Sequence, residues 1–266
     1  MNQSPNVARA FDQIANVFDG QFENEITAKL RRRVYRTVES LLPRGGSILD
    51  INCGTGIDAA YFVSRGFRVT GVDISAEMIR VAQQKHGRNG GPNFRVGSFE
   101  NLSGILNEPF DLAFSNFGGL NCVQRLDIVG KQIAHVLCRD GYFVAMVMPN
   151  FSLWEFFSFA FRGNLSSALR RVGNKAQASG FAGEGFDVYY HSLSTLSKAF
   201  HPWFRTMDVY GMSIISPTPQ SMGFALQFPM LSRLLANVED LVERLPVLRS
   251  VGDHYVMTLQ KRPSME

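Results

Sequence analysis

Apolar and polar positions follow two different periods along the chain. Through residues 23–42 apolar side chains recur at steps of three to four, which predicts an amphipathic helix that ends before Pro43. From residue 47 onward, short apolar runs alternate with helical stretches, typical of a parallel sheet with helices on both faces. The strands predicted in this part lie at residues 47–51, 68–72, 94–96, 111–115 and 142–148.

The pattern becomes irregular after residue 148. Residues 151–188 are rich in Phe and Gly and show no clear strand. Ser192 is predicted to cap a helix that runs to Phe200. Further on we predict strands at 204–210 and 255–260 and an amphipathic stretch at 231–245.

These elements predict one Rossmann-like, doubly wound α/β domain over residues 1–266. We expect a seven-stranded, mostly parallel sheet whose last strand is antiparallel, preceded by N-terminal helices at 7–42. Ligands of open parallel sheets lie beyond the carboxyl ends of the strands. The segments 151–190 and 211–254 are therefore expected to be inserted lids over that edge.

Composition narrows the class of protein. In 266 residues, 45% hydrophobic and 19% charged side chains suit a globular core and exclude a disordered chain. The net charge of +4 is modest, and we interpret the basic run at 31–33 as the solvated face of a helix, so no nucleic-acid partner is expected. The apolar stretch 141–161 is broken by Pro149 and carries Glu155, which favours a strand and a lid over a membrane span.

Cysteine usage adds two expectations. Three cysteines without a CxxC pair predict a reducing compartment and no structural metal site. We see no secretory pattern near the start of the sequence, and we expect a cytoplasmic protein.

The segment LDINCGTGID, residues 49–58, stands where the first strand becomes a helix. Gly54 and Gly56 allow the backbone to approach a ligand closely. Asp73 ends the second strand, where a carboxylate can accept hydrogen bonds from both hydroxyls of an adenosine ribose. With Ala59, the glycines also satisfy the dinucleotide fingerprint, so an NAD-dependent oxidoreductase is one alternative. Asp50 favours S-adenosylmethionine (SAM), because an acid suits its ammonium and sulfonium but would repel a pyrophosphate.

Several longer segments resemble one family. LDINCGTGIDAAYFVSRGFRVTGVDIS resembles motif I and the acidic loop of class I SAM-dependent methyltransferases, in the manner of the ubiquinone/menaquinone biosynthesis group. FDQIANVFDGQFE, FDLAFSNFGGLN and VLCRDGYFVAMVMPN are similar to that group's first helix and to its fourth and fifth strands. The resemblance implies SAM as cofactor, S-adenosylhomocysteine as product and a small-molecule acceptor.

The resemblance also implies which residues bind the cofactor. Asn52 stands where the family has its first glycine, which is tolerable because Asn adopts positive φ more readily than most residues. Ser98 stands where the family often has an aspartate for the adenine amino group. The methionine half is assigned to Asp50, Cys53, Gly54, Thr55 and Gly56, with Asn52 beside them; the ribose to Asp73; the adenine to Ile74, Met78, Ser98 and Phe99; and the methionyl amine to Ser115, Asn116 and Phe117.

The acceptor side is predicted from chemistry. His191 and His254 fall on the carboxyl edge of the sheet, and we hypothesise that one of them, with Tyr190 or Glu184, deprotonates or orients the acceptor. Apolar side chains of the two lids predict a roof over a hydrophobic or aromatic acceptor. The predicted roof comprises Phe151, Leu153, Trp154, Phe156, Phe157, Phe159, Phe161, Met212, Met222, Phe224, Phe228 and Met230.

Some alternatives stay open at this point. Arg162, Arg170, Arg171 and Lys175 could face an anionic acceptor group or, transiently, a membrane surface. A nucleic-acid methyltransferase and a SAM-binding partner protein without catalysis are the other functions considered. The methylated atom (O, N or C) and the oligomeric state are not read from this sequence.

Overall fold

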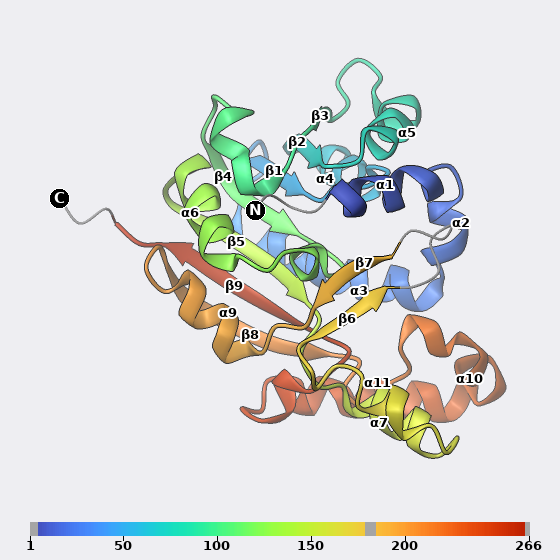
Figure 1. Ribbon diagram of the computed structural model, residues 1–266. Helices are drawn as coiled ribbons and strands as arrows, with labels where there is room; N and C mark the ends of the chain where they lie inside the picture. Colours follow the sequence, from blue (N-terminus) through green and yellow to red (C-terminus); the bar gives the residue numbers. More distant parts are fainter. Residues whose placement is uncertain (1–4, 179–184, 264–266) are drawn as a thin grey trace.

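A seven-stranded sheet forms the centre of the computed structural model, which describes residues 5–178 and 185–263 (Figure 1). Its strand order is β3-β2-β1-β4-β5-β9-β8. β9 runs antiparallel to the other six strands, which all point in the same direction. The order reverses between β1 and β4, which is where α/β sheets bind ligands. The strands are β1 (Ser47–Ile51), β2 (Arg68–Asp73), β3 (Asn93–Val96), β4 (Phe110–Ser115), β5 (Leu137–Val147), β8 (Phe204–Met212) and β9 (His254–Lys261).

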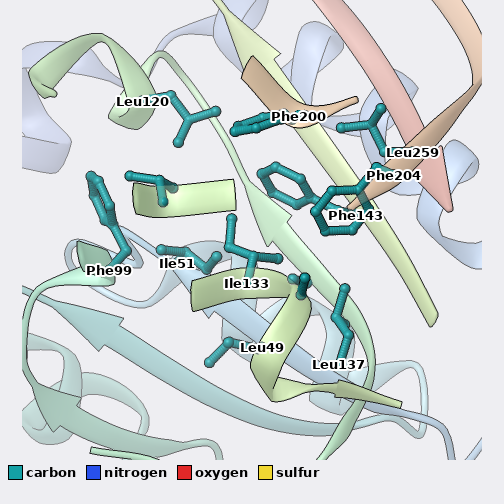
Figure 2. Packing of buried hydrophobic residues seen from close by; sticks show 14 of the residues in the cluster. Leu49, Ile51, Phe99, Leu120, Ile133, Leu137, Phe143, Phe200, Phe204 and Leu259 are labelled. Atoms are coloured by element: carbon teal, nitrogen blue, oxygen red, sulfur yellow. The ribbon is translucent and has the colours of Figure 1, made fainter. Parts of the chain in front are cut away.

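Helices cover both faces of this sheet, as predicted. The first face packs against α3 (Glu25–Leu41), α4 (Ile57–Ser64) and α5 (Ala76–His86). The second packs against α6 (Leu126–Val136) and α9 (Leu193–Phe200). Figure 2 shows this second core, in which Ile133 and Phe200 lie against strand residues. Because side chains alternate along a strand, Ile48 belongs to the first core and Leu49 to the second.

Helix caps hold the ends of several helices in place. The Ser75 hydroxyl accepts from the Met78 amide at 3.0 Å, and the Ser192 hydroxyl accepts from the Thr195 amide at 3.1 Å, so both predicted helix starts are confirmed. The N-terminal helices α1 (Pro5–Ile14) and α2 (Phe18–Phe22) lie beyond the carboxyl edge of the sheet, where α1 contacts α5.

The irregular segments contain more structure than their sequence predicts. The expectation of no strand in 151–188 is wrong, since β6 (Lys175–Ala178) and most of β7 (Phe186–Tyr189) lie there and form a two-stranded antiparallel sheet. Their mixed sequences lack a clear apolar alternation because this small sheet does not join the main one. The helical elements here are α7 (Leu153–Ala160), α8 (Leu165–Ala168), η3 (Pro219–Ser221), α10 (Met222–Gln227), α11 (Pro229–Val242) and η4 (Leu248–Ser250), with η1 (Phe99–Gly104) and η2 (Gly119–Cys122) earlier in the chain.

The long apolar stretch at 141–161 divides between two elements. Its first part belongs to β5 and its last part to α7, as the sequence predicts. In the described part of the chain, no helix combines the length and the apolar character needed to cross a bilayer.

Candidate active site

The turn after β1 is built on left-handed backbone. Asn52, Gly54 and Gly56 have φ of 59°, 54° and 84°. The Asn52 amide nitrogen donates to the Asn116 carbonyl at 3.0 Å, and its amide oxygen accepts from the Ser115 hydroxyl at 2.6 Å. Asparagine therefore meets the backbone requirement of the position and also joins the ends of β1 and β4. The prediction that Asn52 replaces a glycine at positive φ is confirmed.

Asp73 holds the same turn from the end of β2. One carboxylate oxygen accepts from the Gly54 amide and the other from the Ser75 amide, both at 2.9 Å. Burial raises the pKa of this carboxyl to about 6, although the amide hydrogen bonds favour its charged form. Asp73 thus holds the glycine turn and also faces the adjoining cavity.

A cavity lies across the carboxyl ends of β1, β2 and β4, and most residues assigned to the cofactor line it. Its walls combine Asp73 with the apolar side chains of Ile74, Met78 and Phe99. Burial raises the pKa of the Cys53 thiol well above its usual value, which agrees with a packing residue and not a nucleophile. The assigned residues in the lining are Asn52, Cys53, Gly54, Thr55, Asp73, Ile74, Met78, Phe99, Asn116 and Phe117.

Four assigned residues lie behind the lining. Ser115 donates its hydroxyl to Asn52, and Ser98 caps η1 by accepting from the Glu100 amide at 3.1 Å. Gly56 supplies a left-handed residue before α4, where an added Cβ would lie 2.7 Å from the ring of Phe94. For these three, the observed contact is with the protein and not with the cavity.

Asp50 is the fourth of these residues. It is 1% exposed, and its Oδ2 atom has no hydrogen-bond partner among the described residues. Burial, reinforced by the nearby Asp58 carboxylate, raises its pKa well above the usual range. An unsatisfied buried carboxylate behind the cavity wall favours a cationic ligand in front of it.

The N-terminal helices close the cavity from above, which the sequence did not predict. Val7 and Phe11 of α1 and Phe18 of α2 belong to its lining. Thr55 donates its hydroxyl to Asp19 of α2 at 2.6 Å, so the glycine turn and the helix are joined directly. Further residues missed from sequence are Ile57, Asp58, Gly118, Gly119 and Cys122.

Arg31 was also missed, and its interpretation as part of a solvated face is wrong. Its guanidinium lines the cavity, pairs with Asp58 and with Glu23 (Nη2–Oε1 2.6 Å), and lies 4.7 Å from the centre of the Phe117 ring. The helical spacing could have indicated this burial. Position 31 lies four residues after buried Thr27, on the stripe of α3 that faces the protein interior.

A second, largely apolar cavity adjoins the first. We call the first the inner cavity and the second the outer cavity. β6, β7 and η3 contribute Ala178, Val188, Pro219 and other side chains to it. The two cavities have in common the lining residues Phe11, Phe18, Arg31, Phe117, Gly118 and Cys122. A ligand in one cavity would therefore touch the same side chains as a ligand in the other.

The aromatic roof predicted from residues 151–161 is not the wall of either cavity. Trp154 donates its indole N–H to the Ser221 hydroxyl at 2.8 Å and packs 5.2 Å from the ring of Phe224. Phe157 and Phe161 are 47% and 87% exposed. Met212 lies in the core under the sheet, and Met222, Phe224, Phe228 and Met230 lie outside both linings. The prediction failed because α7 packs sideways against η3 and α10.

The predicted histidines occupy different environments. His254 lines the outer cavity, and its Nδ1 atom lies 3.0 Å from Oδ2 of Asp253. His191 is buried with Nε2 at 3.0 Å from the Val123 carbonyl, and burial lowers its pKa. Tyr190 is buried beneath the guanidinium of Arg171, 5.4 Å from its ring centre. His191 and Tyr190 lie outside both linings, and Glu184 lies outside the described residues.

Asp253 is itself held in place. Arg171 donates to its Oδ1 at 2.7 Å and pairs with Glu155 at 2.6 Å, and all three side chains are buried. Burial alone would raise the pKa of the Asp253 carboxyl, but the neighbouring His254 and Arg171 lower it below its usual range. Across the described ranges, no three His, Cys, Asp or Glu side chains are grouped so as to hold a metal ion.

The strand order, the glycine turn and the paired Asp50 and Asp73 define the class I SAM-dependent methyltransferase fold and site. Residues 49–145 match the family model described as a methyltransferase domain. Over these residues the chain is similar to SAM-dependent methyltransferases, and S-adenosylmethionine is the cofactor that this similarity implies.

Individual relatives agree with this class. The chain is 32% identical over 123 residues to YqeM of Bacillus subtilis, which carries the name of a methyltransferase (45% of this chain, 49% of the relative). It is 30% identical over 151 residues to the ubiquinone/menaquinone biosynthesis C-methyltransferase UbiE of Rubrivivax gelatinosus (56% and 58%). The chain spans about half the length of these curated relatives.

A solved structure extends the likeness of fold to nearly the whole chain. It is a chain of the complex between the Trm112 methyltransferase activator of Haloferax volcanii and a methyltransferase. The TM-score is 0.62 at 18% identity, with 98% of this chain and 99% of that chain covered.

Proposed function

We propose that this protein transfers a methyl group from SAM to a small hydrophobic or aromatic acceptor. The observation that carries the proposal is the outer cavity, whose largely apolar wall adjoins the cofactor cavity through six common residues. Ligand sites are typically apolar clefts with a few fixed polar groups, and His254 and Arg31 would supply those groups here. The name of UbiE, which refers to ubiquinone and menaquinone biosynthesis, supports an aromatic acceptor.

The residues of the inner cavity fit the three parts of SAM. Asp73 would accept from the ribose hydroxyls, and Ile74, Met78 and Phe99 would surround the adenine. The backbone beside Gly54 and Asn116 would hold the methionine end, with the buried carboxyl group of Asp50 behind it.

Arg31 would offset the carboxylate of the cofactor. Among the described residues, Arg31 is the one cationic side chain in the lining of the inner cavity. Its existing pairing with Asp58 and Glu23 fixes the side chain before a ligand binds.

SAM, when bound, supplies a methyl group on a cationic sulfur. The chain would provide the setting for the acceptor: an apolar wall that excludes water and a histidine that takes up a proton. Asp253 would orient the His254 ring through Nδ1, leaving Nε2 to accept the acceptor's proton. Asp253 is therefore a positioning residue in this proposal, and Arg171 fixes Asp253.

The first test is cofactor binding followed by a screen of acceptors. Native mass spectrometry should find SAM or S-adenosylhomocysteine on the protein, and radiolabelled SAM should label a phenol, quinone or lipid. With a labelled acceptor, His254→Ala should lower kcat by about a hundredfold and leave the Kd for SAM unchanged. Asp253→Asn should lower kcat less and shift the pH profile of kcat.

The matched control is His201→Ala, because His201 is exposed at the C-terminal end of α9 and lies outside both cavity linings. It should keep wild-type turnover. Full turnover by His254→Ala would refute the role of this histidine, and a protein that binds NAD but not SAM would refute the proposed reaction.

A further inference from the structure

Large apolar side chains are exposed at one corner of the molecule, where α7, α10 and α11 lie together (Figure 1). The contacts of Trp154 with Ser221 and Phe224 join α7 to η3 and α10. We call this surface the apolar corner and define it by its six characteristic side chains. They are Phe161, Leu165, Leu226, Met230, Leu234 and Leu241, each between 58% and 87% exposed.

The helix α11 shows that this exposure follows a pattern. Met230, Leu234, Val238 and Leu241 succeed one another at steps of four, four and three residues, which places them on one stripe of the helix. All four are exposed, whereas Glu239 is 1% exposed and accepts from the Ser216 amide at 3.0 Å. The helix therefore turns its apolar stripe toward solvent and a carboxylate toward the protein, the reverse of the usual arrangement.

The charges around the stripe are mostly positive. In residues 153–174 and 222–250, the exposed charged side chains are four arginines and one aspartate, Asp240. Arg162 and Arg233 form no ion pair within the described ranges. A second copy of the same face would bring these like charges together. A surface of anionic phosphates would instead neutralise them.

We propose that the apolar corner binds an anionic lipid surface. The stripe of α11 would enter the boundary between headgroups and acyl chains, and Arg162 and Arg233 would contact lipid phosphates. An amphipathic helix that binds a membrane through an apolar stripe lies in the interface plane and does not cross the bilayer.

The position of the corner connects it with the outer cavity. Pro219 and Gln220 of η3 line that cavity, and α10 follows directly after them. A docked protein would hold the cavity beside the bilayer, so that, if the proposed methyl transfer is correct, an acceptor dissolved in lipid could reach it. The docking itself does not depend on the proposed reaction.

The test is flotation of the full chain, without SAM, on two kinds of vesicle. The protein should float with phosphatidylcholine vesicles that contain about 30% phosphatidylglycerol and much less with phosphatidylcholine alone. The double variant Leu234→Ser, Leu241→Ser should bind the anionic vesicles about tenfold more weakly or worse. Arg162→Gln with Arg233→Gln should weaken binding and reduce its sensitivity to salt.

Matched controls distinguish binding through the apolar corner from nonspecific adsorption to the vesicles. Met207→Ser removes a half-exposed apolar side chain from β8, and Arg36→Gln removes an exposed arginine from α3. Both variants should bind like the wild type. Equal loss in controls and corner variants would overturn the proposal, as would absence of binding to anionic vesicles. A dimer in sedimentation velocity that the Leu234 and Leu241 changes dissociate, without vesicle binding, would assign the corner to a second copy instead. Thermal unfolding and SAM binding of each variant show whether the fold and the cofactor site are intact.

Discussion

The Asp73→Asn substitution tests the carboxylate that holds the glycine turn and faces the inner cavity. The Asp73 carboxylate accepts from the Gly54 and Ser75 amides and faces the inner cavity, so its remaining lone pairs are available to ribose hydroxyls. A hydrogen bond to a carboxylate is roughly twice as strong as one to a neutral amide. Replacing two such bonds should cost about 2–3 kcal/mol, which weakens SAM binding about 30- to 150-fold.

The pH dependence provides a second readout of the same residue. Because burial raises the pKa of Asp73 to about 6, the cofactor-free protein binds a proton here as the pH falls below that value. SAM requires the charged carboxylate as acceptor. Its affinity should therefore be constant above about pH 7 and fall by up to about tenfold for each pH unit below about 6. Asp73→Asn should remove this dependence.

Titration calorimetry with SAM between pH 5 and pH 8 measures both effects. The matched control is Asp111→Asn, because the Asp111 carboxylate likewise accepts from a backbone amide, that of Ser47, at 2.8 Å. It lies at the opposite end of the sheet, where β4 begins. It should lower the thermal stability without changing the Kd. A Kd for Asp73→Asn within about threefold of wild type, or an equal loss in Asp111→Asn, would refute the reasoning.

Two further predictions concern stability and are measured by urea unfolding. Arg171→Met leaves the buried carboxylates of Glu155 and Asp253 without their shared cation and should cost about 3–5 kcal/mol, whereas Arg170→Met at the exposed neighbour should cost under about 1 kcal/mol. Similar losses in the two variants would contradict the network. Asn52→Ala keeps the left-handed backbone but loses two hydrogen bonds, which should lower the free energy of unfolding by about 2–3 kcal/mol. Asn52→Gly should recover about 1 kcal/mol of that loss, because glycine adopts positive φ without strain. Equal stability of the two variants would show that φ at this position carries no strain.

The features that the sequence predicts well are those set by residues close together in the chain. The strands β1, β2 and β4, the caps at Ser75 and Ser192, and the turn at Asn52 are confirmed to within a residue or two. Each of these is determined by an apolar run, a cap or a backbone preference within a few positions. Most residues that the resemblance assigns to the cofactor line the inner cavity because these same local elements form its wall.

Features that depend on distant contacts were not predicted. Arg31 is a charged residue of the kind usually found at the surface, and its pairing with Asp58 of α4, 27 positions later, compensates its burial. The aromatic run at 151–161 suggests a roof, but its direction depends on Ser221 and Phe224, far along the chain. Both histidines reach the carboxyl edge of the sheet, and the packing of β9 alone places His254 at the outer cavity.

The attachment of the N-terminal helices has a consequence for the reaction cycle. Asp12 accepts from the Ser75 hydroxyl at 2.6 Å and Asp19 from Thr55 at 2.6 Å, so α1 and α2 are fastened to the loops around the cofactor. In the proposed reaction, breaking these bonds would open the inner cavity for S-adenosylhomocysteine to leave and for fresh SAM to enter. We therefore expect product release to limit the turnover rate, and loosening of these two helices to govern cofactor exchange.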